Sequence, residues 1–88
     1  MEVLMHDKEQ WYLLREQDSY YLLVRCSQSA AGFEILIKLS PDEYREFHAC
    51  GRVYLNYLAN RINYWSREYY PRSLLPDMEH KVREAISA

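Results

Sequence analysis

Short apolar runs separated by polar turns occupy the first part of the chain. The runs at 10–16 (QWYLLRE) and 20–26 (YYLLVRC) are rich in aromatic and branched residues, which is typical of the two strands of a β-hairpin. The run at 33–39 alternates, and its apolar face consists of Phe33, Ile35, Ile37 and Leu39. Because the connecting turns are too short for parallel crossovers, we predict an antiparallel meander. Residues 2–5 are a candidate fourth strand at its edge.

The clearest local signal is a helix start at Ser40. Ser40 is a capping residue, Pro41 takes the first helical position, and Glu43 lies three residues after the serine, as in a capping box. Apolar residues then recur at steps of three and four, so we predict one continuous helix over 41–68. Gly51, midway along this face, is interpreted as a point of close approach to the sheet. The predicted core face consists of Tyr44, Phe47, Gly51, Tyr54, Leu58, Ile62, Trp65 and Tyr69.

The predicted helix is longer than the strands that it covers. From residue 41 to 66 it spans about 39 Å at 1.5 Å per residue, whereas a seven-residue strand spans about 23 Å. Its far end therefore needs another cover. One candidate is a short helix over 77–87, where Met78, Val82 and Ile86 recur at helical spacing, and the other is a second copy of the chain. The sequence thus predicts a single α+β domain over residues 1–88. It does not decide which of the two candidates covers the far end of the helix.

Composition narrows the class of protein and its location. A length of 88 residues suits one core. The net charge of −2 provides no long-range field to attract nucleic acid or an anionic membrane. No run approaches the roughly 20 apolar residues of a membrane span, and the N-terminal segment lacks the apolar core of a secretion signal. Two cysteines without a CxxC pair suit a reducing compartment, so we expect a cytoplasmic protein.

No pattern in the sequence indicates catalysis, a cofactor or a metal. His48 and Cys50 are two residues apart on the predicted helix, so their side chains point about 200° from each other. The three histidines lack the short spacings of zinc sites. With two glycines in the chain there is no glycine-rich phosphate loop. We therefore expect a protein that is not an enzyme and that has no catalytic residues, cofactor or metal.

A second stripe of the predicted helix indicates a partner. The stripe consists of Val53, Tyr57, Asn60 and Tyr64 and lies about 130° from the predicted core face. On the sheet, Leu36 likewise lies opposite the core residues of its own strand. Elements that are apolar on two sides imply that another molecule covers one of them. Our hypothesis is a non-catalytic protein-protein interaction protein that forms a homodimer through these five residues.

Two alternatives remain open from the sequence. The first is a nucleic-acid-binding accessory module, because Arg45, Arg52 and Arg67 lie on the exposed arc of the predicted helix and strand tyrosines can stack on bases. Its weakness is the excess of acids over bases, 13 to 11. The second alternative is a partner-neutralising protein of the immunity or antitoxin type, which agrees with the small size and mild acidity.

Overall fold

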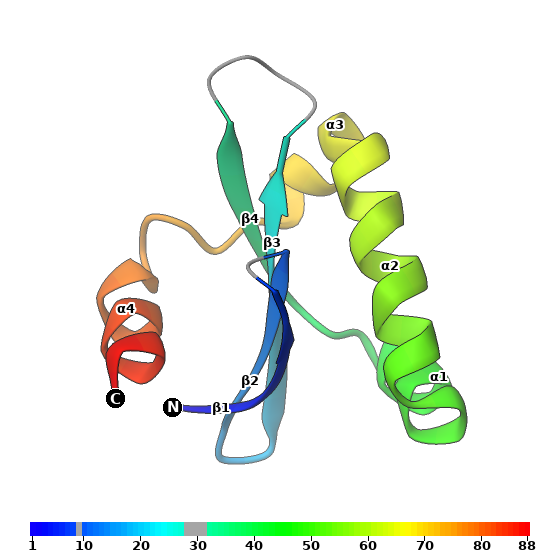
Figure 1. Cartoon of the computed structure of the whole chain (residues 1–88), viewed down its shortest axis with the longest axis horizontal. Coiled ribbons are helices and arrows are strands. Elements are labelled where there is room, and N and C mark those ends of the chain that lie inside the picture. The colour runs from blue at the N-terminus through cyan, green and yellow to red at the C-terminus, as the bar shows by residue number, and fades with distance from the viewer. Residues whose placement is uncertain (9, 28–31) are drawn as a thin grey trace.

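A four-stranded antiparallel sheet lies between two helical layers (Figure 1). The computed structural model describes residues 1–8, 10–27 and 32–88. The strands are neighbours in sequence order, β1-β2-β3-β4, which confirms the predicted α+β meander with its additional N-terminal strand. Helices α1 and α2 lie on one side of the sheet and α4 on the other. The elements are β1 (Glu2–Asp7), β2 (Trp11–Glu16), β3 (Ser19–Cys26), β4 (Phe33–Lys38), α1 (Pro41–Cys50), α2 (Arg52–Tyr64), α3 (Ser66–Tyr69), the 3₁₀ helix η1 (Tyr70–Arg72) and α4 (Glu79–Ser87).

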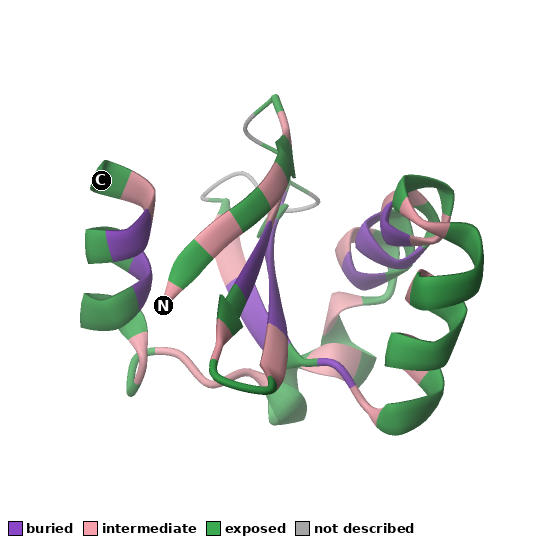
Figure 2. Cartoon of the chain, turned by 90° about the horizontal axis from the view of Figure 1, so that it is seen from below, coloured by how far each residue is buried: buried purple, intermediate pink, exposed green. Residues whose placement is uncertain are grey.

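Alternation along the strands gives the sheet two apolar faces. Successive side chains of a strand point to opposite sides, so one set packs against α2 and the other against α4. Figure 2 shows buried residues on the strands and on the inward sides of the helices. The cluster under α2 contains Trp11, Leu13, Leu22, Val24, Cys26, Ile35, Ile37 and Leu39. The cluster under α4 contains Leu14, Tyr21, Leu23 and Leu36, with Val82 and Ala85 from the helix itself.

The chain's own C-terminal segment covers Leu36. This side chain is fully buried and belongs to the same cluster as Val82 of α4. The backbone carbonyl of Leu36 accepts a hydrogen bond from the N–H of Leu74 at 2.8 Å. The prediction that Leu36 lies on a surface left for a partner is therefore wrong, because α4 already occupies that face of the sheet. The C-terminal segment covers the second face of its own sheet and leaves the exposed side of α2 open.

The predicted continuous helix over 41–68 is interrupted at Gly51. Gly51 has φ 63° and ψ −138°, a conformation that side-chain-bearing residues rarely adopt. A Cβ at this position would meet nothing within 4 Å, so the interpretation of Gly51 as a close approach is wrong and its role is to break the helix. A second break at Trp65, with φ −113° and ψ 44°, ends α2.

The break at Gly51 changes which residues are buried in the second half of the predicted helix. Leu55 and Ala59, which the continuous-helix pattern omits, are 0% and 5% exposed. Trp65, which the pattern includes, is 50% exposed. The buried face of α2 consists of Leu55, Leu58, Ala59 and Ile62.

The helix start at Ser40 has the predicted capping box and an additional ion pair. The Ser40 hydroxyl accepts a hydrogen bond from the N–H of Glu43 at 3.1 Å, and the Glu43 carboxylate accepts one from the N–H of Ser40 at 2.8 Å. The guanidinium of Arg72 also donates two hydrogen bonds to this carboxylate, at 2.6 and 2.9 Å. Burial raises the pKa of Glu43, but the hydrogen bonds from Arg72 and Ser40 outweigh this effect and hold the pKa below its ordinary value.

Glu43→Gln is expected to make the protein less stable at neutral pH and to flatten its acid dependence. Because the folded-state pKa of Glu43 is lowered, its stabilising contribution is present above the unfolded pKa, about 4.3, and is lost as the pH falls below it. Losing the charge-assisted bonds should cost on the order of 1–2 kcal/mol at pH 7. Urea denaturation between about pH 7 and pH 3 measures this. Glu46→Gln, an exposed glutamate of the same helix, is the control, and equal slopes for both variants would contradict the expectation.

Candidate protein-binding surface

The outward side of α2 carries apolar side chains where a helix packed on a sheet normally has polar ones. Val53, Tyr57 and Tyr64 are 74%, 57% and 69% exposed, and Asn60 is exposed between them. At 100° per residue these positions lie about 180° from the buried face of the helix. We call Val53, Tyr57, Asn60 and Tyr64 the α2 stripe. The structure therefore brings four of the five predicted interface residues together on one exposed face and buries the fifth, Leu36, elsewhere.

Aromatic rings extend the α2 stripe at both ends. Trp65 directly follows it, and the ring centroids of Tyr64 and Trp65 are 5.3 Å apart with planes at 60°. Tyr54 lies beside Tyr57, with centroids 6.0 Å apart. The sequence pattern assigned Trp65 to the core, and nothing in that pattern reveals the helix break that turns this side chain outward. Four of the seven exposed large apolar side chains among the described residues lie between positions 53 and 65.

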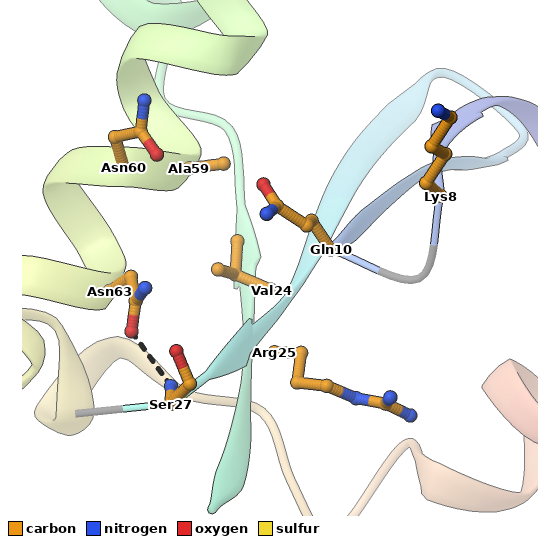
Figure 3. A pocket seen from close by; sticks show the side chains of 8 residues that line it. All are labelled: Lys8, Gln10, Val24, Arg25, Ser27, Ala59, Asn60 and Asn63. Carbon is orange, nitrogen blue, oxygen red and sulfur yellow. Dashed lines mark hydrogen bonds between the residues drawn. The ribbon is translucent and has the colours of Figure 1, made fainter. Parts of the chain in front are cut away.

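A pocket of about 240 Å³ lies beside the α2 stripe, between α2 and the sheet (Figure 3). Its floor is aliphatic, formed by Val24 and Ala59. Gln10, which directly precedes β2, points toward Ala59, and the side-chain carbonyl of Asn63 accepts a hydrogen bond from the N–H of Ser27 at 2.9 Å. The pocket therefore offers an aliphatic floor with neutral hydrogen-bonding groups at its walls. Its lining residues are Lys8, Gln10, Val24, Arg25, Ser27, Ala59, Asn60 and Asn63.

The charged residues of this pocket do not converge on a ligand. In Figure 3 the side chains of Lys8 and Arg25 extend away from α2 and away from each other. To bind an anion in this pocket, the positive charges of Lys8 and Arg25 would have to be directed at the same position, and in this arrangement they are not. Sequence reasoning missed Gln10 and Asn63 as candidate residues, because they are 53 positions apart and only the packing of α2 on the sheet brings them together.

A second hollow lies at the C-terminal end of the α2 stripe. It has a volume of about 350 Å³ and is lined by residues 64–68. Its lining combines the adjacent rings of Tyr64 and Trp65 with the charged side chains of Arg67 and Glu68. Both hollows beside α2 are thus at the C-terminal half of the helix.

The three arginines proposed for nucleic-acid contact lie on three different helices. Arg45 of α1 pairs with Asp42. Arg52 of α2 donates to the backbone carbonyl of His6 at 2.9 Å, pairs with Asp7 at 3.3 Å and lies over the Trp11 ring. Arg67 is exposed on α3. Pairing with carboxylates reduces the positive charge that Arg45 and Arg52 offer to phosphates.

The outer edge of β4 is occupied by the chain itself. The N–H of Leu36 donates to the Ser73 hydroxyl at 3.3 Å, and the carbonyl of Leu36 accepts from the N–H of Leu74 at 2.8 Å. The Arg72 guanidinium donates to the carbonyl of Lys38 at 3.1 Å. A partner strand cannot pair with β4 without displacing these groups.

The outer edge of β1 is protected differently. The register with β2 shifts between Val3 and Met5, which is a bulge that interrupts regular pairing. The bulge also explains why Val3 packs into the cluster under α4 while Met5 packs into the cluster under α2. Arg52 holds the His6 carbonyl near the end of the same strand. Both sheet edges thus carry features that hinder strand addition.

The cysteines and histidines do not form a reactive cluster. Burial, with a smaller contribution from the charge of Glu34, raises the pKa of the Cys26 thiol to about 11, whereas Cys50 is exposed. The His48 ring stacks on Tyr44 with centroids 5.9 Å apart. Across residues 1–8, 10–27 and 32–88, no three His, Cys, Asp or Glu side chains gather where one metal ion would reach them. None of the helices in the described part of the chain has both the length and the apolar character needed to cross a bilayer.

No family model matches the chain, and no curated protein or solved structure is significantly similar to it. The geometry of the α2 stripe and of the hollows beside it is therefore the basis for a functional proposal.

Proposed function

We propose that this protein is a non-catalytic protein-protein interaction protein that self-associates as a homodimer through the α2 stripe. The observation that carries the proposal is the exposure of Val53, Tyr57 and Tyr64 on the side of α2 directly opposite its core. Contiguous patches of exposed apolar side chains often mark interaction surfaces, whereas single exposed apolar side chains are common and need no explanation. A cytoplasmic location is part of the proposal, because both cysteines are free thiols.

The packing of the rest of the molecule supports α2 as the contact. The second face of the sheet is covered by α4, and both sheet edges hinder strand pairing. Tyrosine is enriched at protein interfaces, since its ring supplies apolar area while its hydroxyl stays hydrogen-bonded. Each of the three apolar side chains of the stripe, Val53, Tyr57 and Tyr64, should contribute roughly 1–2 kcal/mol on burial. Six such side chains in a symmetric dimer contribute about 6–12 kcal/mol against an association cost of about 4–15 kcal/mol. The most favourable balance, a surplus of about 8 kcal/mol, corresponds to a micromolar dissociation constant, so we expect a reversible dimer of at most micromolar affinity.

The direct test is the mass of the protein in solution. Sedimentation velocity between about 1 and 100 µM covers the range in which a micromolar dimer forms. A concentration-dependent shift to twice the chain mass is the expected result. A monomer at the highest concentration would refute self-association. The α2 stripe would then be a binding surface for a different protein.

The double variant Tyr57→Lys/Tyr64→Lys is expected to be a folded monomer. Lysine removes apolar contact area and adds positive charge to a helix whose charged residues are all arginines. Truncating hot-spot tyrosines costs on the order of 1–3 kcal/mol each, so the dissociation constant should rise by about 100-fold or more. Circular dichroism checks the fold, and sedimentation checks the mass.

Tyr70→Lys is the matched control for this double variant. Tyr70 is 62% exposed but lies in η1, outside the α2 stripe. It should keep the wild-type association constant. An unchanged dimer in the double variant, or equal dissociation in the control, would place the interface elsewhere.

A further inference from the structure

Helix α4 covers a wide apolar face with few buried side chains of its own. Of its nine residues, all of which the structure describes, only Val82 and Ala85 are buried. The sheet beneath it contributes buried side chains from three strands, namely Leu14, Tyr21, Leu23 and Leu36. An isolated helix of this length is not stable in water, so α4 depends on its contact with the sheet. Because segments with few buried apolar contacts open at the lowest free energy, we expect α4 to open before the strands and α2 do.

Two ion pairs hold α4 at the edges of this face. The Lys81 ammonium lies 3.2 Å from the Glu16 carboxylate, and the Arg83 guanidinium pairs with Glu34. Lys81 and Arg83 directly precede and follow the buried Val82, so they leave the helix on opposite sides of its apolar stripe. Exposed ion pairs of this kind add little stability, but complementary charges determine which partner fits a surface.

The charges on the sheet favour basic side chains at these two positions. The side chains of Glu16 and Glu34 are only 28% and 20% exposed, so water screens their charges less than it screens those of fully exposed residues. Arg25 and Lys38 lie on the same face of the sheet, as the register of β3 with β4 shows. Among the described ion pairs, however, both sheet residues that hold α4 are acidic. A helix that replaces α4 therefore needs a cation on each side of its apolar stripe.

We infer that the sheet face under α4 is a second binding surface, which takes a basic amphipathic helix of a partner protein, and that α4 occupies this surface in the free chain. The packing of α4 defines the chemistry of that partner. Its helix carries one cation on each flank of an apolar stripe, and the stripe has the spacing that α4 uses at Met78, Val82, Ala85 and Ile86. Helices that dock in apolar grooves are recognised through such positions, one and two turns apart.

The covalent attachment of α4 makes it a built-in competitor of such a partner. Segment 73–78 joins η1 to α4, and within it the N–H of Leu74 stays hydrogen-bonded to the carbonyl of Leu36 at 2.8 Å. A helix tethered this closely returns to the face at a high effective concentration. The apparent affinity for a partner is the intrinsic affinity reduced by the fraction of chains in which α4 is detached. Detaching α4 should therefore strengthen binding without any change in the face itself.

Charge reversal on α4 tests the inference without altering the sheet. In Lys81→Glu/Arg83→Glu, both flanks of α4 repel the carboxylates of Glu16 and Glu34, so α4 should detach. The probe is a fluorescent synthetic peptide with the sequence of residues 77–88, which contains the apolar stripe and both basic flanks. Its fluorescence anisotropy should show binding to the double variant at least about 10-fold tighter than to the unmodified chain.

Two controls separate recognition of the helix from non-specific binding. His80→Asp, on the outward side of α4, should bind the peptide as weakly as the unmodified chain does. A second peptide, with glutamate in place of its lysine and arginine, should bind none of the chains, because it repels the two acidic residues of the face. Equal binding of both peptides to the double variant would show general hydrophobic adsorption and overturn the inference.

Amide hydrogen exchange measures the detachment directly. Exchange of residues 79–87 should be faster in the double variant, while β2 and β3 stay protected, which confirms that the sheet remains folded. Adding Glu16→Lys/Glu34→Lys restores both ion pairs with their signs exchanged and should slow the exchange of α4 again. Val82→Asp, which places a carboxylate in the buried contact, detaches α4 by a second route and should strengthen binding of the first peptide in the same way.

The inference fails if a chain with rapidly exchanging α4 and a protected sheet does not bind the first peptide. It also fails if the unmodified chain, His80→Asp and the detached variants all bind this peptide equally. Neither result affects the proposed self-association, because α4 and α2 lie on opposite sides of the sheet (Figure 1). The association constant of the double variant in sedimentation should therefore equal that of the unmodified chain.

Discussion

Val82→Asp is expected to detach α4 from the sheet and expose the second apolar face. Val82 is 1% exposed and packs with Leu14, Leu23 and Leu36, so a carboxylate there would have no partner. An uncompensated buried charge costs on the order of 3–5 kcal/mol, which is a large fraction of the about 5–15 kcal/mol that keeps a small domain folded. Binding of a hydrophobic dye and urea denaturation measure the exposed face and the lost stability.

The reactivity of Cys26 distinguishes local detachment from global unfolding. Cys26 belongs to the cluster under α2, on the other side of the sheet from α4, and its raised pKa makes the native thiol unreactive. In a Cys50→Ser background, detachment of α4 alone should leave Cys26 protected, whereas unfolding should expose it. His80→Asp, on the outward side of α4, is the control and should change stability by about 0.5 kcal/mol or less. Wild-type stability in Val82→Asp would show that α4 does not bury this face.

Leu55→Ala should lower the free energy of unfolding by about 2–5 kcal/mol, as large-to-small changes in cores do. Leu55 is fully buried, whereas Trp65 is half exposed, so Trp65→Ala should cost about 1 kcal/mol or less despite the larger deletion. A continuous helix over 41–68 predicts the reverse order, since Trp65 lies on its core face and Leu55 does not. The pair of variants therefore tests the break at Gly51 directly.

Urea denaturation of both variants should be measured below the concentration of self-association, because dimer formation adds to the apparent stability. Val53→Ala, on the exposed face of the same helix, is the control for loss of helix packing. A larger loss in Trp65→Ala than in Leu55→Ala would show that α2 presents a different face to the sheet.

Local signals in the sequence predicted the elements well. The strand predicted at 10–16 is Trp11–Glu16, and the one predicted at 33–39 is Phe33–Lys38. The short helix predicted over 77–87 is Glu79–Ser87. These elements depend on alternation, turn residues and helical spacing among neighbours in the chain. The capping box at Ser40 is present for the same reason, since all of its groups lie within four residues.

The candidate surface was only partly predictable. Val53, Tyr57, Asn60 and Tyr64 share one side of any helix that includes them, so their common face follows from the sequence. Their position opposite the core depends on the rotation introduced at Gly51, since the continuous pattern placed them only about 130° from it. Trp65 joined this surface for the same reason. The pocket beside Asn60 combines residues from the β1–β2 connection, from the end of β3 and from α2, and no spacing along the chain reveals such a combination.

Local sequence patterns were sufficient to predict the strands, the start of the first helix and the presence of one apolar stripe more than the first core requires. Which apolar face the chain itself covers, and which stays exposed, follows from the packing of the folded chain. Leu36 and Tyr57 look alike as surplus apolar residues in the sequence, yet α4 buries the first and leaves the second in solvent. Burial depends on contacts between distant segments, whereas periodicity indicates only which side of its own element a residue occupies.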